Sequence, residues 1–494
     1  MSAIKKLFGQ TLVYGLSSVL ARILNFLLVP LYTVLFIPSE YAVVSEMYAY
    51  AAFFMVLGSF GMETTFFRFI QAEKNNINSN TFSTAFFFVV FNSCLLSVLG
   101  FIFQDEIASV IRHEAHPEYV TYFIFIIALD LLSIVPFALL RQQNKAFKFA
   151  FFKTINICIN IFFNIFFLLI CPELLNNTSL SNIIETFYNP GISVGYVFIS
   201  NLIASGVTII ILLPEIKNNI NKFDKRLLKK MLLYAWPILI AGIAFIINET
   251  ADKILIKYLL PKGVAMRELG IYSACYKLSI FMTLFVQAYR FAAEPFFFNQ
   301  LDKPDSKSIY AIMLDFFVLF ALMIFLFVVL YIDVIKLIIP NQLYHEGIII
   351  IPIVLMANIF LGIYYNLSVW YKVTNLTQYA AIISLCGATS TIILNLVFIP
   401  LYGYIAAAWT TLVCYVIMTI LSFYLGQKHF KINYNLKSLF KYFSLAISLF
   451  LVSNIFKQTH LNIQIDNTII FLIYLIFMYW QIKKIFKKPN LKSL

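Results

Sequence analysis

Charged residues recur inside two long apolar stretches near the middle of the chain, residues 227–260 and 268–298. They are Glu249, Asp252, Lys253, Lys257, Lys277, Arg290 and Glu294. A charged side chain at the centre of a membrane-spanning helix costs about 2.5 to 3.5 kcal/mol on insertion scales, so it is expected to face a partner or a water-filled cavity. Arginine binds phosphate oxygens through paired hydrogen bonds and lysine adds a point charge, whereas carboxylates bind protons or cations. These stretches therefore hold candidates for both kinds of site.

Two basic residues, Arg22 and Lys277, stand alone in apolar segments. Arg22 lies midway along the first apolar segment with no acid within one turn. It either pairs with a carboxylate of another helix, such as Asp130, or lines a wet cavity, and we favour the cavity because a lipid-facing charge is costly. Lys277 has the same character and the same expected role.

Arg290 precedes Glu294 by four residues, a spacing that permits an ion pair within one helix. That reading and a role for Arg290 in binding an anion are equally open. Pro295 removes a backbone hydrogen bond and predicts a kink near Arg290 in either case. Arg68, at the inner end of the second segment, is a weaker member of the same group of cavity cations and is expected to lie at the membrane interface.

The acidic residues have a plain and a functional interpretation. Glu249 and Asp252 lie three residues apart and are followed by Lys253, so a network of local ion pairs is one interpretation. The other is that a carboxylate in this network, or Asp130 or Asp315, binds a proton or a sodium ion coupled to transport. The sequence does not choose among these carboxylates.

Composition fixes the class of protein. Of the 494 residues, 61% are hydrophobic and 12% charged, which is more apolar surface than a soluble fold of this length can bury. The six cysteines stand singly in apolar runs and are expected to be small apolar residues. No Walker loop, dinucleotide fingerprint or nucleophile elbow occurs, and His113, Glu114 and His116 are expected to form a solvated loop and no metal site. We therefore expect no enzyme activity and no bound cofactor.

Apolar runs of spanning length predict an all-α polytopic membrane protein with about fourteen transmembrane helices. The first run, residues 8–36, is expected to be a retained transmembrane helix rather than a cleaved signal peptide. With the N-terminus inside, 26 of the 36 Lys and Arg residues fall on the inner side and seven on the outer side. This bias predicts that both termini are cytoplasmic. It also explains the net charge of +13 without nucleic-acid binding.

The two halves of the chain resemble each other. Glu40, Ser45 and Tyr48 match Glu268, Ser273 and Tyr276 at one constant offset, and Arg141, Asn144 and Asn164 match Lys372, Asn375 and Asn395 at another. The matches predict two six-helix lobes, residues 1–215 and 216–430, related by a pseudo-twofold axis along the membrane normal. Residues 431–494 then add two transmembrane helices and a basic tail.

A family resemblance rests on the charged hairpin. Its residues are Asp252-Lys253 followed by aliphatic residues, Gly270–Ala274 (GIYSA), Lys277-Leu278, and Gln287 through Arg290, Glu294, Pro295 and Phe296. This pattern resembles that of the oligosaccharide (O-antigen type) flippases, the polysaccharide-transporter branch of the multidrug/oligosaccharidyl-lipid/polysaccharide exporter superfamily. That branch often has Asp-Arg where this chain has Asp252-Lys253, which keeps the charge and loses the guanidinium fork.

The resemblance implies a flippase of the bacterial cytoplasmic (inner) membrane. Its expected substrate is a polyprenyl diphosphate-linked oligosaccharide, such as a repeat unit of O-antigen, capsule or exopolysaccharide, moved by alternating access. Its expected partners are this lipid-linked oligosaccharide, membrane lipids and polysaccharide assembly proteins. The alternatives are a cation-coupled multidrug antiporter of the same superfamily, a membrane polysaccharide polymerase or glycosyltransferase, and a structural scaffold. A multidrug antiporter is expected to present acids and aromatic groups to its drugs, so the charge of the cavity separates it from a flippase.

Overall fold

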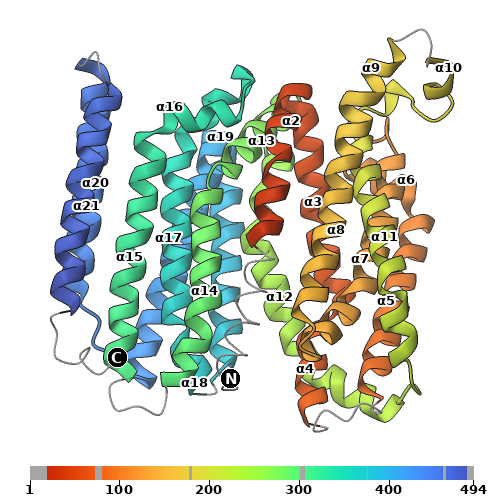
Figure 1. Cartoon of the computed structure of the whole chain (residues 1–494), viewed down its shortest axis with the longest axis horizontal. Helices are drawn as coiled ribbons and strands as arrows, with labels where there is room; N and C mark the ends of the chain where they lie inside the picture. Colours follow the sequence, from red (N-terminus) through yellow and green to blue (C-terminus); the bar gives the residue numbers. More distant parts are fainter. Residues whose placement is uncertain are drawn as a thin grey trace. The chain divides into compact units, whose positions relative to one another are not determined.

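The computed structural model describes residues 19–72, 80–176, 181–300, 306–374, 376–459 and 463–486. Helices joined by short connections make up this part of the chain, and it contains no strand (Figure 1). An all-helical fold follows from the hydropathy, because a helix satisfies every backbone hydrogen bond within its own segment. Close contacts group the chain into two compact units, residues 1–254 and 255–494, each described by itself below.

Unit 1 is a bundle of long helices with a core of large aliphatic and aromatic side chains. Helical turns from Val19 lead into its first helix. Its helices are α2 (Leu28–Leu35), α3 (Pro38–Ser59), α4 (Met62–Ala72), α5 (Thr81–Ile102), α6 (Gln104–Val110), α7 (Glu118–Gln142), α8 (Ala146–Ile165), α9 (Cys171–Leu175), α10 (Ser181–Ile184), α11 (Gly195–Asn219) and most of α12 (Lys225–Leu259). The core lies between α4, α5, α7 and α11, where Phe66, Leu131 and Leu212 are fully buried.

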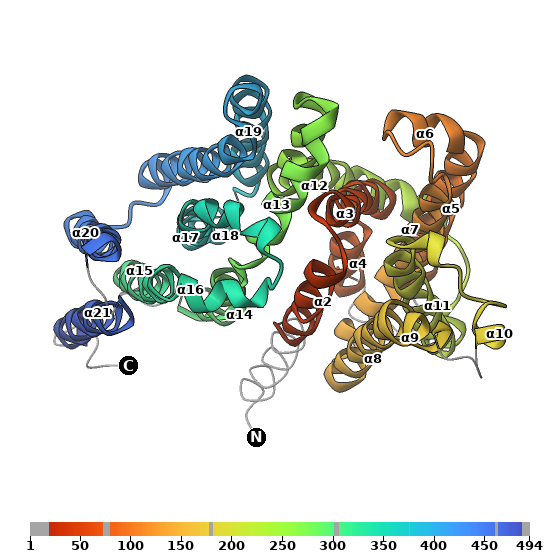
Figure 2. The ribbon, with the colours of Figure 1, turned by 90° about the horizontal axis from the view of Figure 1, so that it is seen from above.

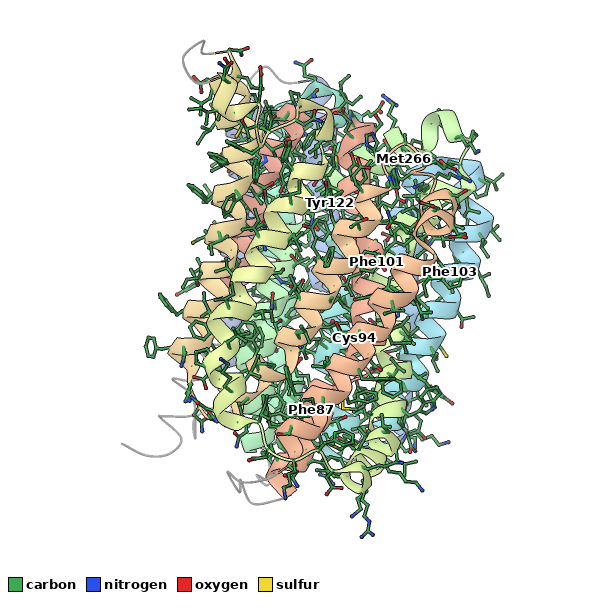
Figure 3. The ribbon with its side chains drawn as sticks, turned by 90° about the vertical axis from the view of Figure 1, so that its right-hand side faces the viewer. Phe87, Cys94, Phe101, Phe103, Tyr122 and Met266 are labelled. Atoms are coloured by element: carbon green, nitrogen blue, oxygen red, sulfur yellow. The ribbon has the colours of Figure 1, made fainter. Side chains whose placement is uncertain are left out.

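The outer surface of unit 1 is apolar. Phe87, Cys94 and Phe101 recur every seven residues along α5 and all three are exposed (Figure 3). A period of seven places them on one face of the helix. An exposed stripe of this kind is the surface expected against lipid.

Unit 2 begins in the last turn of α12. It continues with α13 (Lys262–Lys277), α14 (Ile280–Gln300), α15 (Ser306–Leu330), α16 (Ile332–Ile335), two 3₁₀ segments (Lys336–Ile338 and Gln342–Ile350), α17 (Ile351–Leu367), α18 (Val369–Val373), α19 (Gln378–His429), α20 (Leu436–Thr459) and α21 (Ile463–Phe486). The last two helices lie beside α15 (Figures 1 and 2). Asn467 of α21 links these helices to α15. Its Nδ2 donates to the Leu330 carbonyl at 2.7 Å, and its Oδ1 accepts from the Ser453 hydroxyl of α20 at 2.7 Å.

Two helices of unit 2 are interrupted, and neither interruption lies at the predicted kink near Arg290. Helix α14 continues through Arg290 and Pro295, whereas α13 and α14 meet at an angle of 51° across residues 278–279. At this break the Tyr276 carbonyl accepts both the Ser279 N–H at 3.0 Å and the Ser279 hydroxyl at 2.7 Å. In α19 the interruption is Gly403, whose φ of 62° and ψ of −150° suit only glycine.

Three prolines of the apolar segments take different positions in the helices. Pro136 and Pro237 lie inside α7 and α12, which continue past them. Pro352 occupies the first turn of α17, where a missing N–H costs nothing. Pro352 lies where the 3₁₀ segment Gln342–Ile350 passes directly into α17.

Eleven of the described helices are long and apolar enough to span a membrane, or twelve if α13 and α14 form one broken span. This finding establishes a multi-pass membrane protein. Helix α19 contains two of the predicted segments, 377–399 and 404–426, separated at Gly403. The predicted first segment is described only from residue 19, as the shorter helix Val19–Leu35. The total of fourteen stays a prediction.

Candidate functional site: a cation-lined pocket in unit 2

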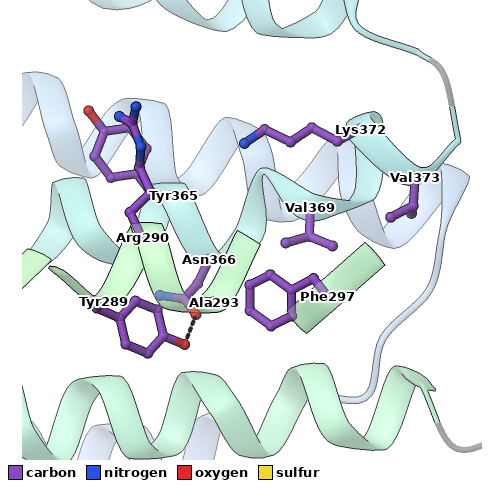
Figure 4. A pocket seen from close by; sticks show the side chains of 9 residues that line it. All are labelled: Tyr289, Arg290, Ala293, Phe297, Tyr365, Asn366, Val369, Lys372 and Val373. Carbon is purple, nitrogen blue, oxygen red and sulfur yellow. Dashed lines mark hydrogen bonds between the residues drawn. The ribbon is translucent and has the colours of Figure 1, made fainter. Parts of the chain in front are cut away.

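A pocket opens between α14, α17 and α18 (Figure 4). Its basic residues are Arg290 of α14 and Lys372 of α18. The Arg290 guanidinium stands over the ring of Tyr365, with its central carbon 5.0 Å from the ring centre. The Lys372 side chain extends along the pocket toward Arg290 and Tyr365. Two cations from different helices therefore converge on one pocket.

The stacking of Arg290 on Tyr365 leaves its hydrogen bonds available. A guanidinium attracted to an aromatic ring uses its face, while its five N–H donors point outward in its plane. The edge of the fork can therefore still bind an oxyanion with two parallel hydrogen bonds. The side chain of Glu294, one turn further along α14, lies outside the described part of the structure.

The rest of the pocket is held by an amide network and an apolar floor. The Tyr289 hydroxyl lies 2.6 Å from Asn366 Oδ1, and the Asn366 amide donates to the Gly362 carbonyl at 3.0 Å. Ala293 and Phe297 of α14 are buried against Val369. Among the described lining residues, Arg290 and Lys372 are the charged ones. The cavity volume of about 20 Å³ admits a water-sized group in this conformation.

Lys277 is placed at the break between α13 and α14. It is the last residue of α13 and its side chain is exposed. Arg290 follows ten residues after Ile280, which corresponds to about 15 Å of helix at 1.5 Å per residue. Lys277 and Arg290 therefore lie at different depths of the same broken helix.

The structure does not join Arg22 to Asp130. Arg22 is exposed, and no ion pair involves it among the described residues. The Asp130 carboxylate instead accepts a hydrogen bond from Ser205 at 2.7 Å and interacts electrostatically with Lys153. The alternative pairing of Arg22 with Asp130 is therefore not formed, because Lys153 of α8 is the cation that interacts with Asp130, and the favoured role of Arg22 in a cavity stays a prediction. Arg68 is exposed on α4 near the end of that helix, a position that suits the expected interfacial role.

Lys153 was not predicted as a buried charge. By sequence it belongs to the basic inner connection, but it lies two turns inside α8 with its ammonium 4.2 Å from the centre of the Phe137 ring. Its apolar neighbours, Phe151 and Phe152, were the signal that could have placed it inside the helix.

The acidic cluster of α12 forms a local ion pair. Lys253 Nζ lies 3.0 Å from Asp252 Oδ1 and also donates to the Glu249 carbonyl at 3.1 Å. Asp252 is almost completely buried. The predicted local pairing is confirmed for Asp252 and Lys253, while a coupling role for Asp252 or Glu249 stays a prediction. Asp315 is buried in α15, and its coupling role is a prediction as well.

The buried acid Glu46 was not predicted from the sequence. Glu46 of α3 is fully buried, and its Oε2 lies 3.4 Å from His113 Nε2. The expectation that His113 belongs to a solvated loop is therefore wrong for this side chain, which is only 10% exposed. His116 is more exposed, and its Nδ1 lies 2.9 Å from Glu118 Oε1. No group of three potential metal ligands occurs among the described residues.

Comparisons with solved structures show which known proteins share this fold. The lipid II flippase MurJ in its inward closed conformation matches 95% of this chain and 99% of its own, with 15% identity and a TM-score of 0.71. An inward-facing multidrug resistance MATE transporter of the MOP superfamily covers 85% of this chain and 94% of its own, with 11% identity and a TM-score of 0.61. A mutant of the MATE transporter VcmN from Vibrio cholerae covers 86% and 96%, with 15% identity and a TM-score of 0.60. These likenesses show a shared fold.

Sequence comparison gives the family. No curated protein matches the chain. The family model described as "Polysaccharide biosynthesis protein" matches residues 7–300, which is more than half of the chain and includes the charged stretches 227–260 and 268–298. The chain therefore belongs to the polysaccharide biosynthesis protein family.

Proposed function

We propose that this protein is a flippase that moves a polyprenyl diphosphate-linked oligosaccharide from the inner to the outer leaflet of the bacterial cytoplasmic membrane by alternating access. The observation that carries the proposal is the pocket in which Arg290 and Lys372 converge, in a chain of the polysaccharide biosynthesis family. A diphosphate is the most highly charged part of such a substrate, and Arg and Lys are the side chains that bind it. The lipid II flippase MurJ has the same fold, which supports the proposal.

The proposed site consists of basic residues on otherwise apolar helices. Arg22, Lys277, Arg290 and Arg68 are all exposed within their units, as groups that meet a passenger must be. The carboxylates Glu249, Asp252, Asp130, Asp315 and Glu294 are the candidates for binding a coupling proton or sodium ion. Both termini are proposed to be cytoplasmic on the basis of the basic inner connections.

A cation-coupled multidrug antiporter is the second candidate, because MATE transporters share the fold. The described pocket argues against it. Its two charged residues are positive, and a positive pocket repels the cationic drugs that such an antiporter would have to bind.

Deleting the gene tests the proposal in cells. The flippase hypothesis expects lipid-linked oligosaccharide to accumulate on the cytoplasmic face of the membrane and surface glycan to disappear. The measurement is the access of a membrane-impermeant glycosidase to the lipid-linked sugar in intact cells and in inverted vesicles. Single repeat units that reach the cell surface without being polymerised would instead identify a polymerase and refute the flippase.

A further inference from the structure

We propose that the pocket of Arg290, Lys372 and Tyr365 is a separate entry site, which binds the phosphate groups of the substrate before they reach Lys277. This inference rests on the proposed flippase function. It adds one feature to that proposal. The basic residues of α13, α14 and α18 form two successive binding sites instead of a single site.

The separation follows from helix geometry. About 15 Å of α14 lies between Ile280, just after the break, and Arg290. The two side chains therefore start from different depths of the broken helix, and the proposal places the phosphates at Arg290 first and at Lys277 later. The 51° bend at residues 278–279 changes the direction of the helix and leaves the length of α14 unaffected.

The position of Lys372 identifies the pocket as the entry side. Lys372 lies in α18, in the short connection between two spans that the positive-inside pattern assigns to the cytoplasm. Arg290 lies in the second half of α14, toward the same end. The substrate is built in the cytoplasmic leaflet under the proposed function, so its phosphates meet these two residues first.

Each described residue has a distinct part in binding. Arg290 supplies a planar fork for two phosphate oxygens, and Tyr365 holds the fork by its ring at 5.0 Å. Lys372 adds a flexible point charge from the other side of the pocket. Asn366 is hydrogen-bonded to Tyr289 and to the Gly362 carbonyl. The pocket, whose volume is about 20 Å³ in this conformation, must widen to admit a phosphate group.

The test is calorimetric binding of farnesyl diphosphate to the purified full chain in nanodiscs of phosphatidylcholine. Arg290→Gln and Lys372→Gln are each expected to weaken binding about tenfold, which corresponds to 1.4 kcal/mol. Lys372→Arg is expected to bind normally, whereas Arg290→Lys loses the fork and binds weakly. Tyr365→Phe keeps the ring and binds like the wild type, and Tyr365→Leu does not. Unchanged binding in both Gln variants overturns the proposal.

Lys307→Gln is the matched control. Lys307 is an exposed lysine at the start of α15 that lies over the Phe430 ring at 4.7 Å and does not line the pocket. Its removal takes away the same charge, so binding is expected to be unchanged. An equal loss of binding in Lys307→Gln means that general surface charge attracts the ligand, and this result overturns the proposal.

Two further arms identify the ligand and the role of Glu294. Phosphatidylglycerol in the nanodisc is expected to leave the binding of farnesyl diphosphate intact, whereas complete competition by this phospholipid would assign the pocket to bulk lipid and refute an entry site. Glu294→Gln is expected to strengthen binding, because a carboxylate one turn from Arg290 competes with the phosphate. Weaker binding in Glu294→Gln would make the pair structural and contradict the proposal.

Failure of this inference and failure of the proposed function give different results. If Arg290→Gln exports glycan like the wild type while Lys277→Gln does not, the entry site is wrong and the flippase stands. If the deletion strain accumulates no lipid-linked oligosaccharide, the flippase is wrong whatever the pocket binds.

Discussion

Arg22, Lys277 and Arg290 each place a positive charge on a helix that is otherwise apolar. All three side chains are exposed within their units. A spanning helix that keeps such a charge must obtain an interaction that offsets about 2.5 to 3.5 kcal/mol of insertion cost. Under the proposed function, a diphosphate passenger supplies that interaction during transport.

Neutralising these charges is therefore expected to abolish export. Arg22→Gln and Lys277→Gln should each lower the rate of glycan export by at least about tenfold, the effect of losing one charged hydrogen bond to phosphate. Insertion and yield should be unchanged, because removing a charge makes the helix more apolar. The measurement is surface glycan by gel and the amount of protein in the membrane. Lys262→Gln, an exposed lysine at the other end of α13, is the control and should export normally.

Asp130 and Lys153 are expected to depend on each other. Their opposite charges interact inside unit 1, where both side chains are half-buried, so removing one leaves the other without its partner charge. Asp130→Asn and Lys153→Met should each destabilise the protein by roughly 3 kcal/mol, and the double variant should be closer to wild type. Thermal unfolding of the four proteins in one detergent measures the coupling. Strictly additive losses would show that the two residues act independently.

Residue-level prediction from sequence succeeded where the amino-acid type alone carries the signal. An arginine inside an apolar run is a candidate by its type alone; Arg290 lines a pocket, and its role in binding stays a prediction. Lys372, Lys153 and Glu46 were missed as functional or buried charges because their meaning comes from neighbours on other helices. The partner of Asp130 could not be deduced, since one sequence does not say which helix packs against which.

Helices were the most predictable level of this fold, because hydropathy fixes where a chain can cross lipid. The interruption of α19 falls at Gly403, between the predicted segments 377–399 and 404–426. The break at residues 278–279 was not predicted, since it contains neither glycine nor proline. The Ser279 hydroxyl bonds back to the Tyr276 carbonyl there, but serines do this in unbroken helices as well, so Ser279 gave no signal of a break.

Gly403 is expected to be irreplaceable. A Cβ atom there would lie 2.5 Å from Glu268 Oε2, which also accepts the Tyr404 N–H at 3.2 Å. With φ at 62° and ψ at −150°, Gly403→Ala should cost at least about 1 to 3 kcal/mol, seen as a lower unfolding temperature in detergent. Gly206→Ala is the matched control, because a Cβ there meets nothing within 4 Å and should be neutral. Equal stability of the two variants would contradict the strain at Gly403.

At the scale of the whole molecule, the chain divides into two units, and residues matched in the predicted repeat have related surroundings. Asn164 and Asn395 are both fully buried, and each accepts a hydroxyl hydrogen bond, from Tyr32 at 2.8 Å and from Thr410 at 2.6 Å. The lobe boundaries at residues 215 and 430 stay a prediction.

Reconstituted transport tests the central claim most directly. The purified chain is placed in liposomes with a fluorescent polyprenyl diphosphate-linked oligosaccharide in the outer leaflet, and the fraction that becomes protected from an impermeant quencher is followed with time. Our account expects protection to rise in wild-type and Lys262→Gln vesicles, and to stay at the level of protein-free vesicles with Lys277→Gln. Protection that never exceeds the protein-free level with the wild-type protein, or uptake of a cationic dye in place of the lipid, would contradict it.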